Sequence, residues 1–325
     1  MSKVQTVKGP VEADQLGFTL MHEHVFVLST EIEENYKTGF GEEEARIEQA
    51  VDRLNELAAA GVKTFVDLTV IGLGRDIKRV QRVAERVDLN IVVATGLYTY
   101  NELPFYFLYR GPGTLLGGEE PLVDMFVGDI EQGIAGTGVK AGILKCATEH
   151  QGITPDVERV LRAVAQAHRR TGVPISTHSF APGRNGLDQQ RVFSEEGVDL
   201  SRVVIGHSGD TTDIGYLREI ADAGSYLGMD RFGIDILLPF EQRVDTVAEM
   251  CRLGYANKMV LSHDAACHND WFDDAALEVA TPNWHFMHIL RDVIPALRER
   301  GVTEEQIRQM TEENPTKIFS ERSPY

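Results

Sequence analysis

The sequence predicts an α/β fold, a (β/α)8 TIM barrel, in a single domain over residues 1–325. Two observations lead to this prediction. About eight short apolar runs alternate with amphipathic segments along nearly the whole chain, as strands and helices alternate in such a barrel. No linker or change of composition divides the 325 residues. A doubly wound open sheet is the alternative, but it usually has fewer strands.

The alternation starts near the amino terminus. The apolar run FTLMHEH (18–24) is the first expected strand, and the amphipathic segment 42–61 is the first expected helix, which ends at the helix-terminating residue Gly61. The other strands are expected at 62–70, 90–96, 139–148, 173–179, 202–208, 225–230 and 258–264. Helices are expected at 76–88, 123–134, 155–172, 188–197, 214–224, 241–254 and 284–301.

Composition excludes several classes of protein. The hydrophobic fraction of 42% and the charged fraction of 25% are ordinary for a soluble globular chain. A net charge of −18 argues against a nucleic-acid partner, because phosphate binding needs a basic surface. No stretch approaches the roughly 18 apolar residues of a membrane span, and no signal-peptide core opens the chain. We therefore expect no membrane partner and a cytoplasmic location, which suits three cysteines without CxxC spacing.

Two connections are longer than usual, at residues 98–121 and 265–283, and each follows the carboxyl end of an expected strand. Long loops in a compact domain are usually functional or mobile. Barrels carry their active sites at the carboxyl-terminal face. We therefore expect the functional site at that face.

Side chains that suit a metal site recur at the ends of the expected strands. His22 and His24 are two residues apart on one strand, so they point to the same side, and Glu23 between them points away and is expected to be structural. A single His-X-His motif would support a metal site only weakly. In a barrel, however, six candidates meet at the carboxyl-terminal mouth: His22, His24, Lys145, His178, His207 and Asp264.

This set suits two divalent metal ions. Imidazoles and a carboxylate are ligands for zinc, iron, cobalt or manganese. One tetrahedral ion needs fewer ligands, whereas two ions roughly 3.5–4 Å apart would use them all and hold a bridging hydroxide as the nucleophile. Lys145 is unusual because an ammonium group has no lone pair. A desolvated lysine near cations loses its proton readily, and could then take up carbon dioxide as a carbamate that bridges the metals.

Five motifs follow one another in order: HEH at 22–24, GILKCATE at 142–149, STHS at 176–179, IGHSGDT at 205–211 and LSHDA at 261–265. This order resembles the phosphotriesterase family of the amidohydrolase superfamily, and the closing TEENPTKIF (311–319) is similar to that superfamily as well. The resemblance covers nearly the whole chain and implies a binuclear metal centre at the barrel mouth.

The resemblance also implies a role for each ligand. The ligands would divide between two ions, with His22, His24 and Asp264 on the more buried one, and His178 and His207 on the more exposed one. A carbamylated Lys145 and a hydroxide would bridge the two ions. Asp264 would also accept the proton released when the hydroxide attacks, as a general base.

Four further positions resemble the phosphotriesterase-like lactonase branch and are expected to contact substrate: Tyr98, Arg231, Cys267 and Trp271. In that branch a tyrosine at the position of Tyr98 lies over the metals and contacts the lactone oxygen, which implies a catalytic role for Tyr98. The organophosphate-specialised branch commonly has histidine at the position of Arg231. The lactonase branch therefore fits better.

We expect an enzyme that opens lactone rings, with N-acyl-homoserine lactones (quorum quenching) as the leading substrate and phosphotriesters as a side activity. Apolar residues at 105–108 and 271–272 would line a channel for the acyl chain, although a subunit contact explains the aromatic cluster 105–109 equally well. A homodimer would be similar to the family. The alternatives are organophosphate triesters, other lactones or cyclic amides as substrates, or a barrel that binds without catalysis.

The other histidines are given no role. We expect His150 on a loop, His168 on a helix surface, and His263 directed toward the helices. His285 and His288 are one helical turn apart, and a packed helix face explains them better than a second metal site.

Overall fold

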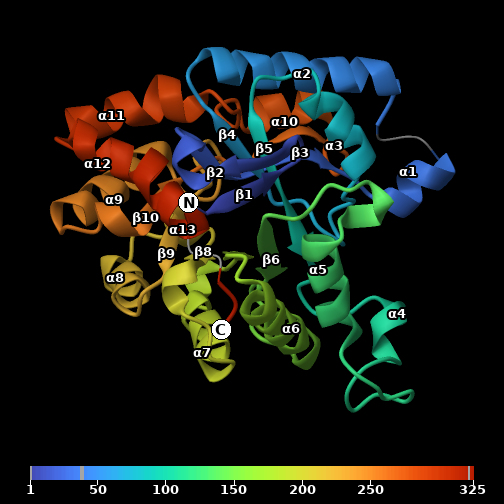
Figure 1. The fold of residues 1–325 in the computed structure, drawn as a ribbon. Helices are drawn as coiled ribbons and strands as arrows, with labels where there is room; N and C mark the ends of the chain where they lie inside the picture. Colours follow the sequence, from blue (N-terminus) through green and yellow to red (C-terminus); the bar gives the residue numbers. More distant parts are fainter. Residues whose placement is uncertain (1, 37–39, 321–322) are drawn as a thin grey trace.

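The structure contains a ring of parallel strands surrounded by helices (Figure 1). It is a computed structural model that describes residues 2–36, 40–320 and 323–325. The predicted barrel is confirmed, because each strand pairs in parallel with the next strand along the chain. The strands of the ring are β3 (Thr19–Val27), β4 (Thr64–Asp67), β5 (Asn90–Gly96), β6 (Ile143–Ala147), β7 (Ile175–His178), β8 (Val203–Ile205), β9 (Tyr226–Met229) and β10 (Met259–Leu261).

The ring closes through a broken eighth strand. β10 pairs with β9. Four residues separate β10 from β11 (Ala266–Asn269), which pairs in parallel with β3. Between them, the Asp264 amide donates to the carbonyl of His22 at 3.0 Å, and the His24 amide donates to the carbonyl of Ala265 at 2.8 Å. The sequence predicted β10 but not β11, since a run with small and polar residues has little strand propensity of its own.

Helices follow the strands around the outside of the ring. Their bounds are α1 (Thr30–Tyr36), α2 (Glu43–Ala59), α3 (Ile77–Ala84), α4 (Phe105–Leu108), α5 (Pro121–Glu131), α6 (Pro155–Thr171), α7 (Gly186–Glu195), α8 (Ile214–Asp222), α9 (Phe240–Arg252), α10 (Asp274–Ala280), α11 (Ile294–Glu299), α12 (Glu304–Arg308) and α13 (Asn314–Ser320). The long α6 illustrates the local signals. Thr154 caps its first turn by accepting from the Val157 amide, and Gly172 ends it with a φ of 71°.

Two apolar cores hold this arrangement together. One fills the space between the strands and the helices. The other fills the inside of the ring with residues such as Val66, Val92 and Tyr226. An antiparallel hairpin of β1 (Lys3–Thr6) and β2 (Gly9–Glu12), which the sequence analysis did not predict, adds Val4 to the inner core.

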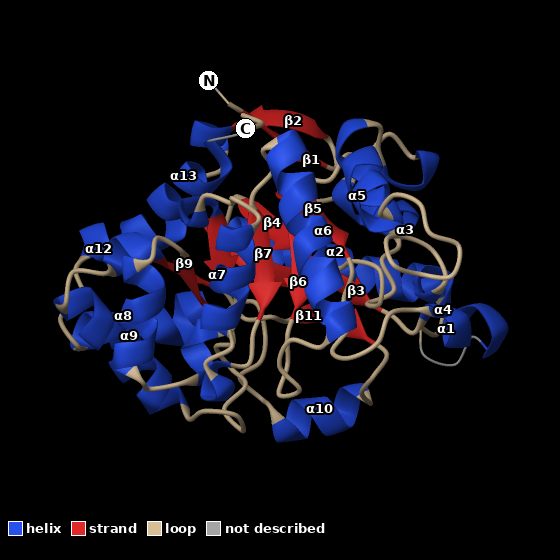
Figure 2. Ribbon diagram, turned by 90° about the horizontal axis from the view of Figure 1, so that it is seen from below, coloured by secondary structure: helices blue, strands red, loops and turns tan. Residues whose placement is uncertain are grey.

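The two ends of the barrel therefore differ. The hairpin covers the amino ends of the strands, while the carboxyl ends point to the long loops and to α10 (Figure 2). Within the described parts of the chain, no helix is long and apolar enough to cross a membrane. The arrangement leaves one open mouth for a functional site.

Candidate metal centre and active site

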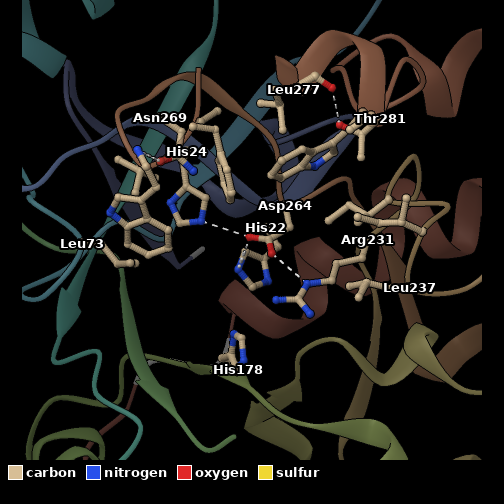
Figure 3. A pocket seen from close by; sticks show the side chains of 18 of the residues that line it. His22, His24, Leu73, His178, Arg231, Leu237, Asp264, Asn269, Leu277 and Thr281 are labelled. Carbon is tan, nitrogen blue, oxygen red and sulfur yellow. Dashed lines mark hydrogen bonds and ion pairs between the residues drawn. The ribbon is translucent and has the colours of Figure 1, made fainter. Parts of the chain in front are cut away.

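The six side chains predicted at the strand ends meet at the carboxyl-terminal mouth. The Nε2 atoms of His22 and His24 lie 3.3 and 3.1 Å from Oδ1 of Asp264. Nζ of Lys145 lies 2.9 Å from Nε2 of His22. On the other side of the cluster, Nδ1 of His178 and Nε2 of His207 are 2.9 Å apart. His22, His24, His178, Asp264 and Arg231 can be seen together in Figure 3.

The backbone is bent at two of these positions to aim the side chains inward. His207 and Asp264 have positive φ values of 60° and 56°, a left-handed conformation that is costly for residues other than glycine. Gly206, just before His207, is required for another reason, because a Cβ there would lie 1.9 Å from the carbonyl oxygen of Thr177. Such strain is typical of sites that the surrounding fold holds in place.

Asp230 fixes two of the four imidazoles from behind. Its Oδ2 accepts a hydrogen bond from Nδ1 of His22, and its Oδ1 accepts one from Nδ1 of His207, both at 2.9 Å. These bonds place the ring protons on Nδ1, so both Nε2 lone pairs face the centre of the cluster.

Separate partners fix the other two imidazoles. Nδ1 of His24 donates to the Thr69 hydroxyl at 2.8 Å, and this hydroxyl donates in turn to Asp67 at 2.5 Å. Nε2 of His178 donates to Oε2 of Glu149 at 2.8 Å. Every imidazole in the cluster therefore has one anchored nitrogen and one nitrogen that faces inward.

The titration behaviour of the cluster suits metal binding. Burial lowers the pKa of His178 to about 4, and burial also lowers the pKa values of His22 and His207 well below 6.5. The rings are therefore neutral at pH 7, the form that binds metals. Burial likewise lowers the pKa of Lys145 to about 8, which favours the neutral amine that carbon dioxide requires.

The two buried carboxylates of the site differ in the direction of their pKa shifts. Burial, together with the charge of Asp264, raises the pKa of Asp230 well above its usual value. A buried carboxylate is costly unless a cation compensates it. Burial opposes ionisation of Asp264 too, but His22, His24 and Arg231 outweigh it and hold its pKa well below the usual value.

The donor set consequently fits divalent cations. His22, His24 and Asp264 present ligand atoms within 4.8 Å of one another. His22, His207 and Asp230 form a second such group, but its carboxylate oxygens lie on the Nδ1 side, where they accept hydrogen bonds. The inward nitrogens of His178 and His207, which lie 2.9 Å apart, would be the ligands available to a second ion.

A chain of alternating charges leads away from Asp264. Nε of Arg231 donates to Oδ2 of Asp264 at 2.9 Å, and its Nη1 donates to Asp210 at 3.0 Å. Asp210 also accepts from the buried Arg243 at 2.7 Å. Burial lowers the pKa of Arg231, but the flanking carboxylates outweigh this effect and raise the pKa above its usual value, so the guanidinium is always charged.

Tyr98 lies beside the cluster, as predicted. Its hydroxyl is 3.2 Å from Nδ1 of His178 and forms a short hydrogen bond with the hydroxyl of Tyr100. Burial raises the pKa of Tyr98 well above 10, so the phenol stays protonated and can donate a hydrogen bond.

A cavity of about 570 Å³ opens above the cluster. Tyr98, Arg231 and Trp271 line it, together with five of the six predicted ligands; His207 lies outside the lining. Its walls are mainly apolar, and Figure 3 shows Leu73, Leu237 and Leu277 around the polar floor. The apolar lining residues are Val27, Leu73, Ile234, Ile236, Leu237, Ala266, Trp271, Phe272, Ala276, Leu277, Ala280 and Trp284.

Three expectations about individual side chains are wrong. Cys267 does not line this cavity, because its side chain packs in the core between strands and helices, where burial raises the pKa of the thiol. Residues 105–108 do not line it either, since Phe107 is buried in the outer core and Phe105 is 78% exposed. His168 is buried rather than on a helix surface.

Residues around the ligands were not predicted. Asp230 directly follows the end of β9, a position at which other strands carry a predicted ligand, so its place in the chain was the available signal. Asp67 likewise ends β4. Glu149 has no such signal, because it acts from the loop after β6.

The residues given other roles lie as expected. Glu23 points away from the cluster, and its carboxylate accepts from the amides of His263 and Ala265 at 2.9 Å, which supports the break between β10 and β11. His263 faces the helices and accepts from the Ile289 amide. His288 is buried and donates to Asp292 at 2.8 Å.

Comparisons with known proteins agree with this architecture. The sequence matches the profile of the Phosphotriesterase family over residues 2–319. It is 62% identical over 325 residues to the phosphotriesterase homology protein of Mycobacterium tuberculosis, covering 100% of both chains. It is 43% identical over 316 residues to the aryldialkylphosphatase of Saccharolobus solfataricus, covering 96% of this chain and 98% of the relative. The solved structure of the phosphotriesterase from Mycobacterium tuberculosis superposes with a TM-score of 0.98 at 62% identity, covering 99% of this chain and 100% of that one.

Proposed function

The chain belongs to the phosphotriesterase family of metal-dependent hydrolases, and from this premise we propose that it hydrolyses lactones, with N-acyl-homoserine lactones as its preferred substrates. Hydrolysis of such signals would make it a quorum-quenching enzyme. The observation that carries the proposal is the cavity, whose polar floor holds the ligand cluster, Tyr98 and Arg231, and whose walls are apolar. A lactone head group matches the floor, and an acyl chain matches the walls.

Two divalent ions, when bound by the six ligands, would polarise the ester carbonyl and supply a hydroxide nucleophile at neutral pH. The protein's own residues orient the reaction. The Tyr98 hydroxyl lines the cavity and is protonated at neutral pH, which supports a role in which it donates a hydrogen bond to an oxygen of the lactone.

Asp264 is the residue placed to receive a proton. Its pKa lies well below the usual value, so it is ionised, and Arg231 holds its Oδ2 in position at 2.9 Å. In the proposed reaction Asp264 accepts the proton released as the carbonyl is attacked and passes it to the alkoxide that leaves on ring opening. The product is the open-chain hydroxy acid.

A phosphotriesterase is the second candidate, since the relative from Saccharolobus solfataricus is named an aryldialkylphosphatase. The proposal favours lactones because arginine stands at position 231, where the organophosphate-specialised branch commonly has histidine. Phosphotriesters remain expected as weaker substrates, because the same nucleophile can attack phosphorus.

A substrate comparison tests the proposal. We expect kcat/KM for a long-chain N-acyl-homoserine lactone to exceed that for an aryl dialkyl phosphate by at least about tenfold, which is about 1.4 kcal/mol of transition-state stabilisation. An Asp264→Asn variant of the same preparation serves as the control for contaminating hydrolases. A higher kcat/KM for the phosphotriester would assign the protein to the second candidate function.

A further inference from the structure

His178 differs from the other imidazoles of the cluster in what anchors it. Its outer nitrogen donates to Glu149, whose side chain is 16% exposed at the mouth of the barrel. The carboxylate of Asp230, which anchors two of the other rings, is 1% exposed. The anchor of His178 therefore belongs to a loop at the mouth and not to the buried interior.

Glu149 is itself held in place by the fold. Its Oε1 accepts from the His150 amide at 2.9 Å, so both carboxylate oxygens have donors. Its main-chain oxygen accepts from the Gly152 amide at 2.8 Å and from Nδ2 of Asn185 at 2.9 Å. The loop after β6 and the start of α7 thus fix Glu149 before it contacts any ligand.

The anchors are distributed unequally over the two proposed ion sites. Asp230 contacts one ring from each site, His22 and His207. Glu149 contacts His178, a ligand of the more exposed ion in the proposed centre. A substitution of Asp230 is therefore expected to change the metal affinity of both proposed sites, whereas a substitution of Glu149 is expected to change that of one.

We propose that Glu149 is a positioning residue that sets the affinity of the more exposed metal site, through His178, separately from the buried site. This inference rests on the proposed binuclear centre. The carboxylate fixes the orientation of the ring, and it makes the inward nitrogen a better donor because it withdraws the proton of the opposite nitrogen. Loss of such a partner typically lowers metal affinity 10- to 100-fold.

Titration of Co²⁺ into the chelator-stripped full-length protein, against a competing metal indicator, tests the inference. Glu149→Ala removes the acceptor, and Glu149→Gln keeps an acceptor oxygen but removes the charge. We expect Glu149→Ala to weaken binding of one Co²⁺ equivalent by about 10- to 100-fold and leave the other within about twofold. Glu149→Gln should show an intermediate loss of affinity for that Co²⁺ equivalent. If the alanine variant does not fold, Glu149→Gln alone tests the inference.

Two further variants serve as references. Asp230→Asn should weaken both equivalents, and Glu102→Gln, which removes the same charge from an exposed position on another loop, should weaken neither. If the Glu149 variants bind both equivalents as the unmodified protein does, or lose both equally, the inference is overturned while the binuclear centre stands. An unmodified protein that binds fewer than two equivalents overturns the proposed centre and this inference with it.

Discussion

Lys145 is the residue whose substitution tests the proposed carbamate bridge between two ions. It is 1% exposed, and its Nζ lies 2.9 Å from Nε2 of His22 and donates to the carbonyl of Thr177 at 3.2 Å. We expect Lys145→Ala to lower kcat/KM for lactones by at least about 100-fold, because an alanine cannot carry a bridging carbamate. A short carboxylic acid such as acetate should restore part of the activity. A fully active Lys145→Ala protein would exclude the carbamate role.

At the scale of the residue, the sequence predicted where the ligands lie but not what holds them. His22, His24 and Asp264 were predictable because strand ends of a barrel converge whatever their separation in the chain. Cys267 was misplaced because β11 was not predicted, and on this strand its side chain points away from the side of the cavity-lining Ala266, into the outer core. Glu149 was missed because its partner, His178, is distant in sequence.

At the scale of the element, we expect α10 to determine how kcat/KM depends on the length of the acyl chain. One face of this helix, with Ala276, Leu277 and Ala280, lines the cavity, while Val279 on another face is 84% exposed. We expect Leu277→Ala to lower kcat/KM for a long-chain lactone by about tenfold and to spare a short-chain one, because apolar contact with the chain is lost. Val279→Ala is the matched control, and an equal loss on both substrates would contradict the assignment.

Helix α6 supplies a pH-dependent contribution to stability. Its His168 donates to the Val173 carbonyl at 2.6 Å, and burial lowers its pKa to about 4. In the unfolded chain the pKa is about 6.5, so between pH 6.5 and 4 the unfolded state binds more protons and stability falls as pH falls, by at most about 3 kcal/mol. Urea unfolding of His168→Gln should show a shallower loss over that range. The same change at His150, which is 67% exposed, should leave the slope unaltered, and an unaltered slope for His168→Gln would refute this role.

Element prediction succeeded where the periodicity was strong. Segments such as α6, with apolar residues at helical spacing and a cap at each end, lie close to their predicted bounds. The short strand β11 was missed because its residues gain strand structure from β3, which is far away in the chain. The hairpin of β1 and β2 was missed as well, and each of its strands has only four residues.

At the scale of the whole molecule, the order of motifs predicted the fold and the family. Which residues line the cavity and which lie on the surface could be learned only from the structure. Residues of α4 do not line the cavity, so we keep a subunit contact as the interpretation of its exposed Phe105 and Tyr106, and the homodimer stays a prediction. The apolar walls of the cavity come mainly from the loop after β9 and from residues 266–284 after β10, with Val27 of β3 and Leu73 after β4, and we expect them to set the preference among substrates. No single motif encodes that shape.

Metal reconstitution tests the central claim, that a binuclear centre opens lactones, most directly. The protein is stripped with a chelator, and N-acyl-homoserine lactone hydrolysis is followed while cobalt, manganese or zinc is added stepwise. The account predicts that the stripped protein is inactive and that activity rises to a plateau near two equivalents of metal per chain. Lactone hydrolysis that survives complete removal of metal, or a plateau at one equivalent, would contradict it.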